Sequence, residues 1–243
     1  MKIFVDSANF VELEEALKRG FPAGITTNPA IMAKEKKGSF DRHIRKIIDL
    51  IKAYGYDVPL SIEVFTKDPQ EMIRQARAFL RNFGDYSNLY IKVPIGWDEL
   101  KIIHELRRTG VKVNCTCCMS VNQALMAAAA GANFVSLFWG RIQDVGYNAF
   151  EVVQKTAGVF HRSGVASELV VGSIRHIVDI NEAFEAGADI VTVPPRFFKA
   201  FCSHPKTDES VDQFVREFQA WLEPEPKRPA RPAAAGKGGR RRT

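Results

Sequence analysis

Short apolar runs alternate with amphipathic stretches along almost the whole chain, and this alternation limits the possible folds more than any other feature. Each apolar run has the length and residue types of a buried strand, and each amphipathic stretch has helical spacing. Strands that alternate with helices favour a parallel sheet. The candidate strands are Lys2–Asp6, Ala23–Thr26, Leu60–Phe65, Leu89–Val93, Lys112–Cys117, Phe134–Phe138, Leu169–Gly172 and Ile190–Val193.

Eight such units within 243 residues predict a TIM (β/α)₈ barrel, a single α/β domain over residues 1–222. A doubly wound sheet is the alternative, but it needs a glycine-rich phosphate turn after the first strand, where this chain has Asp6-Ser7-Ala8-Asn9. A further helix is predicted over Asp208–Leu222. It could pack on the barrel or on a neighbouring subunit.

The formal net charge of +6 is concentrated at the C-terminus. Residues 223–243 hold seven Lys and Arg against two Glu, a surplus of 7 − 2 = +5. Rich in Pro, Ala, Gly and Arg and without apolar periodicity, this segment is predicted to be a disordered basic tail. Nucleic acid is therefore not an expected partner, except through this tail.

Neither a membrane location nor a metal site is indicated by the sequence. No apolar run approaches the roughly 20 residues needed to cross a bilayer, and Met1–Asp6 turns acidic before a signal peptide could form. Cys115, Cys117, Cys118 and Cys202 lack zinc-site spacing. We expect a cytoplasmic protein with reduced cysteines, no metal and no cofactor.

Polar residues recur at the positions of these strands that face the barrel interior. Leu89, Ile91 and Val93 are apolar and suit the helix-covered face, which places Lys92 inside. The same alternation places six further polar side chains inside and directs Cys115 and Cys117 outward. The inward set comprises Asp6, Ser61, Glu63, Asn114, Thr116 and Ser136, while Thr26 and Asn28 share one face and Ser173 ends the seventh strand.

An interior of this kind is unfavourable for stability alone, because each unpaired buried polar group costs about 1–3 kcal/mol. Lys92 by itself suits a structural ion pair as well as chemistry. Many polar residues at the carboxyl ends of different strands favour an enzyme, since barrel active sites lie there. A confined lysine can lose its proton and attack a carbonyl to form a Schiff base, while Asp6 and Glu63 move protons.

A phosphate site is predicted beyond the sixth and seventh strands. Arg141 follows the sixth strand, and Ser173 and Arg175 precede the next helix. Guanidinium groups beside a helix N-terminus bind phosphate, and this part of a barrel often holds such a site. The combination favours a phosphorylated substrate.

Five stretches resemble the transaldolase family, particularly its short members, which include transaldolases and fructose-6-phosphate aldolases. They are VDSAN (5–9), GITTNPAIMAKE (24–35), NLYIKVP (88–94), NCTCCMSVNQALMAAAAGANFVSLFWGRI (114–142) and VVGSIRHIVDINEAFEAGADIVTVPP (170–195). The resemblance spans roughly residues 1–222 and does not include the tail.

The resemblance implies a role for each site residue. Lys92 would form the Schiff base, Asp6 would act as acid and base for carbon-carbon cleavage, and Glu63 with Thr116 would position a water. The implied substrate contacts are Thr26, Asn28, Asn114, Ser136 and Phe138, with Arg141, Ser173 and Arg175 on the phosphate.

The implied reaction transfers a dihydroxyacetone unit from fructose 6-phosphate or sedoheptulose 7-phosphate to an aldose phosphate. Glu63 and Phe138 are transaldolase-like, since fructose-6-phosphate aldolases look to have Gln and Tyr there. Release of free dihydroxyacetone, another sugar phosphate, or a binding protein that acts through its tail remain the alternatives. Short family members also imply a homo-oligomer, a pentamer or decamer.

Overall fold

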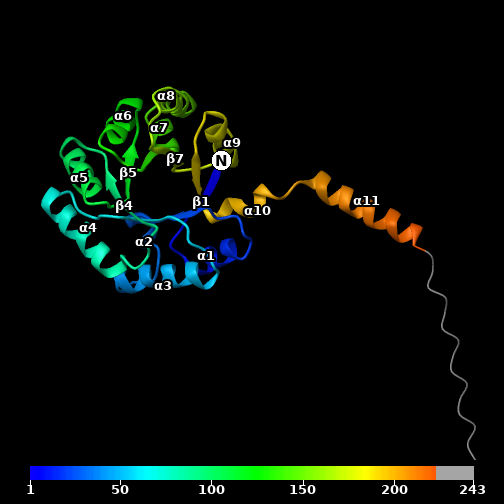
Figure 1. The fold of residues 1–243 in the computed structure, drawn as a ribbon. Coiled ribbons are helices and arrows are strands. Elements are labelled where there is room, and N and C mark those ends of the chain that lie inside the picture. Colours follow the sequence, from blue (N-terminus) through cyan, green and yellow to red (C-terminus); the bar gives the residue numbers. More distant parts are fainter. Residues whose placement is uncertain (223–243) are drawn as a thin grey trace, which may run out of the picture. The chain divides into compact units, whose positions relative to one another are not determined.

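Eight parallel strands close into a barrel in the computed structural model, which describes residues 1–222. Each strand pairs with its neighbours in sequence, and the last pairs with the first (Figure 1). The predicted fold class is therefore confirmed. The strands are β1 (Lys2–Asp6), β2 (Gly24–Thr26), β3 (Leu60–Glu63), β4 (Leu89–Pro94), β5 (Val113–Cys118), β6 (Phe134–Phe138), β7 (Glu168–Gly172) and β8 (Ile190–Val193).

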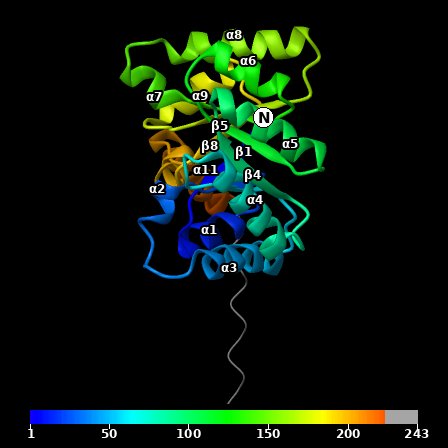
Figure 2. The same cartoon turned by 90° about the vertical axis from the view of Figure 1, so that its left-hand side faces the viewer.

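Helices surround the strands on all sides of the barrel (Figures 1 and 2). Most begin at a side chain that accepts from the first free backbone N–H groups, such as Asp68 before α4 and Asn148 before α8. The barrel helices are α1 (Phe10–Leu17), α2 (Pro29–Met32), α3 (Phe40–Ala53), α4 (Pro69–Phe83), α5 (Trp97–Arg108), α6 (Val121–Ala129), α7 (Trp139–Asp144), α8 (Ala149–Arg162), α9 (Ile177–Glu185), the 3₁₀ turn η1 (Pro195–Phe197) and α10 (Phe198–Phe201).

The main hydrophobic core lies between the strands and the helices. Helix α3 buries Ile44, Ile47, Ile48 and Ile51, whose spacing of three and four residues forms one face of a helix. These side chains pack against the outward-facing apolar residues of the strands, such as Ile62. Apolar packing therefore occupies the outer face of the sheet.

A second, smaller cluster fills the barrel interior at its amino-terminal end. Phe4, Phe134, Val170 and Ile190 are buried there, and the Phe134 ring stacks on Tyr90 with 4.3 Å between centroids. Gly24 is required beside this cluster, because a Cβ on it would lie 2.5 Å from the Phe4 ring. The interior is thus apolar at this end, which leaves the polar residues at the other.

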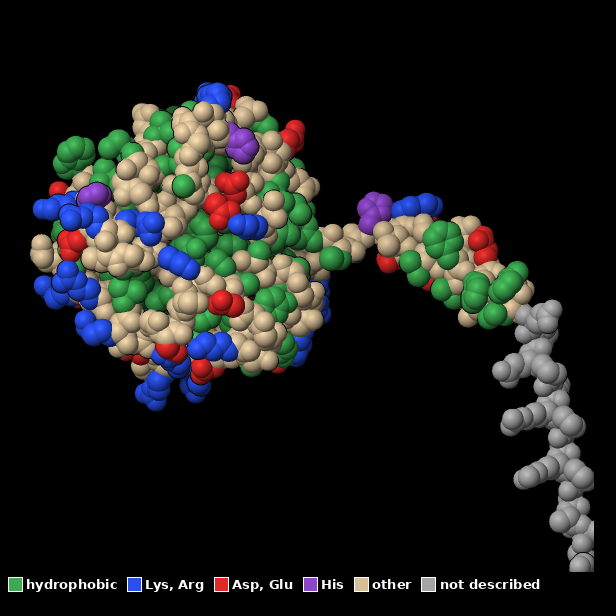
Figure 3. All heavy atoms as spheres, viewed as in Figure 1, with side chains coloured by type: hydrophobic (Ala, Val, Ile, Leu, Met, Phe, Trp, Pro, Cys, Tyr) green, Lys and Arg blue, Asp and Glu red, His purple; other side chains and the backbone are tan. Residues whose placement is uncertain are grey.

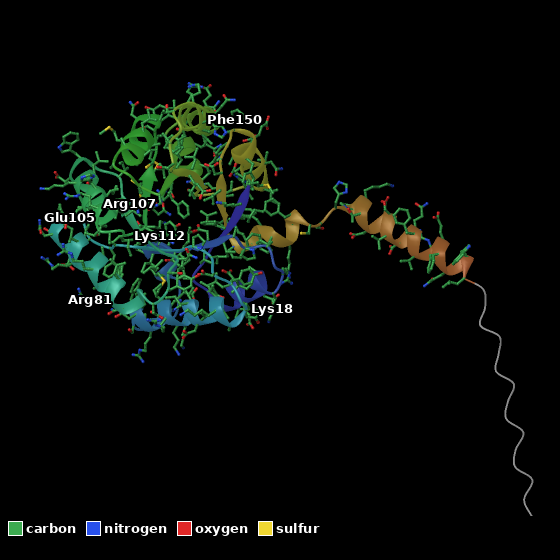
Figure 4. All side chains as sticks on the ribbon, in the orientation of Figure 1. Lys18, Arg81, Glu105, Arg107, Lys112 and Phe150 are labelled. Carbon is green, nitrogen blue, oxygen red and sulfur yellow. The ribbon has the colours of Figure 1, made fainter. Side chains whose placement is uncertain are left out.

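Polar contacts hold the loops around the amino-terminal end. Arg107 and Lys112, labelled in Figure 4, donate to backbone carbonyls of nearby loops: Arg107 Nε to Gly131 at 2.7 Å and Lys112 Nζ to Ser87 at 3.0 Å. Acidic and basic side chains are interspersed over the barrel face shown in Figure 3. These contacts stabilise the loops at the amino-terminal end of the barrel.

The chain divides into two compact units, a barrel unit of Met1–Phe201 and a second unit that begins at Cys202. The second unit contains α11 (Pro205–Trp221), which confirms the predicted C-terminal helix and starts earlier, where His204 accepts from the Lys206 backbone N–H. The predicted tail, 223–243, lies outside the described residues, and the domain boundary at 222 stays a prediction. Among residues 1–222, no helix has the length and apolar character needed to cross a membrane.

Candidate active site

The carboxyl-terminal ends of the strands surround a cavity of about 340 Å³. Strands β1, β2, β3, β4, β5, β6 and β8 each contribute a side chain to its wall, as expected for a barrel active site. The lining residues are Asp6, Thr26, Asn28, Pro29, Ala30, Glu63, Lys92, Cys117, Ser136, Phe138, Arg141, Gly172, Ser173 and Thr192. Most of the residues predicted from the sequence are therefore brought together in one place.

Lys92 lies inside the barrel, as the apolar face of β4 predicted. Its Nζ is 3.3 Å from Oε2 of Glu63, and the two side chains are 5% and 12% exposed. The Nζ also donates to the Thr27 carbonyl oxygen at 3.1 Å. Strand register places Glu63 directly beside Lys92, so the pairing follows from the β3–β4 ladder. The amine thus has two polar partners, and Lys92 also lines the cavity.

Asp6 lies in the same cavity at the end of β1, hydrogen-bonded to a neighbouring strand. Its Oδ1 accepts from Thr26 Oγ1 at 2.7 Å, and the same hydroxyl lies 2.5 Å from Thr192 Oγ1. Burial raises the pKa of Asp6 above its usual 3.8, while Lys92 and the Thr26 hydroxyl act in the opposite direction. A carboxylate that retains its proton to higher pH is better matched to proton transfer near neutrality.

Asn114 and Thr116 lie in the barrel interior beside the cavity without forming part of its wall. Asn114 donates to Ser61 Oγ at 3.2 Å and accepts from Ser136 Oγ at 2.7 Å, so it anchors Ser136, which does line the cavity. Thr116 is fully buried, and its hydroxyl has no hydrogen-bond partner. An unpaired buried hydroxyl is costly for stability and favours a role with a bound molecule.

Two of the three residues predicted to bind phosphate line the cavity, and the third does not. Arg141 and Ser173 line the cavity, and the Ser173 carbonyl accepts from the Gly140 N–H at 3.1 Å. Arg175 does not line it, because its guanidinium forms a bidentate ion pair with Asp144. A Cβ on Gly140 would lie 2.5 Å from Arg175 Nε and 2.6 Å from the Ser173 carbonyl oxygen. Only glycine fits there.

Asn28 and Phe138 line the cavity at the ends of their strands. The Asn28 side chain also caps α2, since its Oδ1 accepts from the Ile31 N–H at 2.9 Å. This contact holds the amide at the cavity wall. Phe138 immediately precedes α7, so its position depends on the first turn of this helix, which contains Gly140 and Arg141.

Five lining residues were not foreseen as site residues from the sequence, namely Pro29, Ala30, Cys117, Gly172 and Thr192. Thr192 is the one polar residue of the run IVTV in β8. A single polar residue in an apolar strand could have predicted its inward direction from the sequence. Cys117 was predicted to face the helices, and this was wrong. The β5–β6 register shifts between Cys115 and Cys118, and Cys117 has a φ of 59°. The irregularity breaks the alternation and turns Cys117 to the cavity.

No group of three or more His, Cys, Asp or Glu side chains within residues 1–222 is arranged to hold a metal ion. The chemical groups that the cavity offers are an amine, two carboxylates, hydroxyls, an amide, a thiol and a guanidinium. Such a set can form and hydrolyse an imine and can move protons during the reaction.

Comparisons with known proteins agree with this geometry. Residues 3–227 match the family described as Transaldolase/Fructose-6-phosphate aldolase. The chain is 36% identical over 220 residues to "Probable transaldolase 1" of Listeria monocytogenes serotype 4b (strain F2365), covering 90% of this chain and 99% of that protein. It is also 36% identical over 220 residues to "Probable transaldolase" of Symbiobacterium thermophilum, covering 90% and 98%. The chain therefore belongs to the transaldolase/fructose-6-phosphate aldolase family, in its short transaldolase class.

Proposed function

We propose that this protein is a transaldolase that uses Lys92 to transfer a dihydroxyacetone unit between sugar phosphates. One observation carries the proposal: the Lys92 amine lines a polar cavity at the carboxyl ends of the strands together with Asp6 and Glu63. The two relatives named above bear the name probable transaldolase, which supports the same activity.

The reaction begins at the carbonyl of the ketose phosphate. Neutral Lys92 Nζ adds to this carbon, and loss of water gives an iminium ion. Glu63, 3.3 Å from Nζ, is placed to take the ammonium proton and to guide the departing water. The buried Thr116 hydroxyl, which lacks a partner, is suited to hold that water.

Carbon-carbon cleavage needs a base at the hydroxyl on the carbon two positions from the carbonyl carbon. Asp6 takes that proton, the bond breaks, and the electron pair moves to the iminium nitrogen to form an enamine on Lys92. The released aldose phosphate leaves. An acceptor aldose phosphate then adds at the same carbon, Asp6 returns the proton, and water frees the new ketose from Lys92.

The remaining lining residues orient the sugar. Thr26, Asn28 and Ser136 offer hydrogen bonds to its hydroxyls, with Asn114 holding Ser136 in place. Arg141 and the turn at Ser173 suit the phosphate, and Arg175 joins them if its ion pair with Asp144 opens. Such contacts fix the sugar carbonyl near Nζ.

Borohydride trapping tests this function directly. Reduction in the presence of fructose 6-phosphate should add one three-carbon unit to the peptide that contains Lys92. The variant Lys92→Arg should give no adduct, because a guanidinium stays protonated. Lys112→Arg, at the amino-terminal end of the sheet, is the matched control and should be trapped like the wild type. Absence of a wild-type adduct at saturating sugar would refute the proposal.

Simple aldol cleavage is the second candidate, and it shares the same Lys92 chemistry. Transfer is favoured because the cavity holds Glu63 and Phe138, the transaldolase-like pair. The double variant Glu63→Gln with Phe138→Tyr should raise release of free dihydroxyacetone relative to transfer. An unchanged ratio would reject this assignment, and wild-type release without acceptor would favour the aldolase.

We further infer a cytoplasmic homo-oligomer, a pentamer or decamer. Helix α11 supports this, because Val211, Phe214, Val215, Phe218 and Trp221 recur at helical spacing and are exposed within their own unit. Apolar faces of this kind are usually covered by a partner surface. Light scattering of the full chain should give the mass of five or ten chains. The double variant Phe214→Asp with Phe218→Asp should have a lower mass. A monomeric wild type would contradict the inference.

A further inference from the structure

Three cysteines lie within four residues of β5, and they differ sharply in their surroundings. Cys115 and Cys118 are fully buried in the core between sheet and helices. Cys117 is only partly buried and lines the cavity that contains Lys92. The irregular register of β5 against β6 separates the three thiols in this way.

The groups around Cys117 belong to the cavity that contains Lys92. The Glu63 carboxylate raises the pKa of its thiol, while the Lys92 ammonium and the neighbouring Thr116 hydroxyl lower it. Burial is the largest of these effects, and together with Glu63 it raises the pKa of Cys117. The thiol is therefore protonated at neutral pH and does not compete with Lys92 for a carbonyl.

We propose that Cys117 is a modification site inside the catalytic cavity, at which a low-molecular-weight disulfide attaches reversibly and excludes the sugar. The cavity of about 340 Å³ admits a small reagent, and it is where the substrate must lie. A group on Cys117 projects into the same space as the Lys92 amine. The effect on sugar binding rests on the proposed function, whereas the modification itself does not.

The chemistry is thiol–disulfide exchange. The Cys117 thiol first loses its proton, so the exchange runs through the minor thiolate form and is faster at alkaline pH. This thiolate attacks one sulfur of the disulfide, the new sulfur-sulfur bond forms as the old one breaks, and the leaving thiolate takes up a proton. Cys117 is oxidised and half of the reagent is reduced. A free thiol reverses the exchange by the same steps, so that the sugar site is restored.

The reagent 2-hydroxyethyl disulfide tests the proposal on the full-length protein. Peptide mass mapping should find the adduct on Cys117 and on exposed Cys202, with labelling of Cys115 and Cys118 slower by about tenfold or more because they are buried. Saturating fructose 6-phosphate should slow labelling at Cys117 and leave Cys202 unchanged. Dithiothreitol should remove both adducts.

Two variants separate the consequence for sugar binding from labelling elsewhere. After treatment, Cys202→Ser should lose borohydride trapping at Lys92 like the wild type, while Cys117→Ser should keep the trapping level of its own untreated sample. Failure of Cys117 to label, or full trapping with Cys117 labelled, would overturn the proposal. If untreated protein gives no Lys92 adduct, the proposed function fails, and preferential labelling of Cys117 over Cys115 and Cys118 still decides the modification site.

Discussion

The carboxylate of Asp6 and the hydroxyl of Thr26 are joined by a 2.7 Å hydrogen bond across β1 and β2. The Thr26 Oγ1 also lies 2.5 Å from Thr192 Oγ1 on β8, the strand on the other side of β1. The carboxylate that we assign to proton transfer is therefore held by a hydroxyl pair that spans the two strands next to its own.

Replacement Thr26→Val should move the acidic limb of the activity profile to higher pH. The Thr26 hydroxyl stabilises ionised Asp6 and lowers its pKa, so its removal lets Asp6 keep its proton longer. Activity should fall most at low pH. Steady-state kinetics between pH 5 and 9 measure the shift, with Thr156→Val, a buried threonine of α8, as the control. An unchanged profile would remove Thr26 from this role.

Replacement Asp6→Asn should lower activity by about 10²–10⁴-fold, the usual range for a general acid–base group. It should also stabilise the fold at neutral pH. Because burial raises the pKa of Asp6, its proton binds more tightly in the folded state, and this contribution to stability is lost as pH rises through the folded pKa.

The free energy of unfolding of Asp6→Asn relative to wild type should accordingly increase from below pH 3.8 toward neutrality and then level off. Chemical denaturation at several pH values measures this difference. A variant less stable than wild type at pH 7 would mean that attraction from Lys92 outweighs burial.

Replacement Gly140→Ala should damage the phosphate side of the cavity. The added Cβ would lie 2.6 Å from the Ser173 carbonyl oxygen and 2.5 Å from Arg175 Nε. The first turn of α7 must therefore shift, which should lower the free energy of unfolding by about 1–3 kcal/mol. We expect a higher KM for the sugar phosphate. Gly38→Ala, where the nearest atom is 3.9 Å away, is the matched control. A wild-type KM would show that the turn does not hold phosphate.

Replacement Asp144→Asn should release Arg175 toward the cavity. Both side chains of this ion pair are partly exposed, 42% for Arg175 and 39% for Asp144, and exposed pairs contribute about 0–1 kcal/mol. We therefore expect KM for the sugar phosphate to fall by no more than about fivefold. Glu151→Gln, which breaks an exposed pair with Lys155, is the control. A rise in KM would instead assign Asp144 to orienting Arg175.

Much of the barrel could be predicted because its signals are local. The alternation of apolar runs and amphipathic stretches predicts eight strands, and the observed strands differ from the predicted ones by at most two residues at an end. The apolar neighbours of Lys92 predict its inward direction, which its burial beside Glu63 confirms. A strand with regular alternation shows from its sequence which side chains share a face.

Contacts between residues that lie far apart in the sequence could not be predicted from its periodicity. Cys117 turns to the cavity because β5 loses register against β6, and Arg175 is drawn to Asp144 rather than to the cavity wall. Asn114 and Thr116 share the predicted face but are fully buried and do not line the cavity. Sequence periodicity by itself therefore determined the barrel and the inward lysine. Strand register and ion pairing, which depend on residues brought together only by folding, decided which side chains a bound sugar can reach.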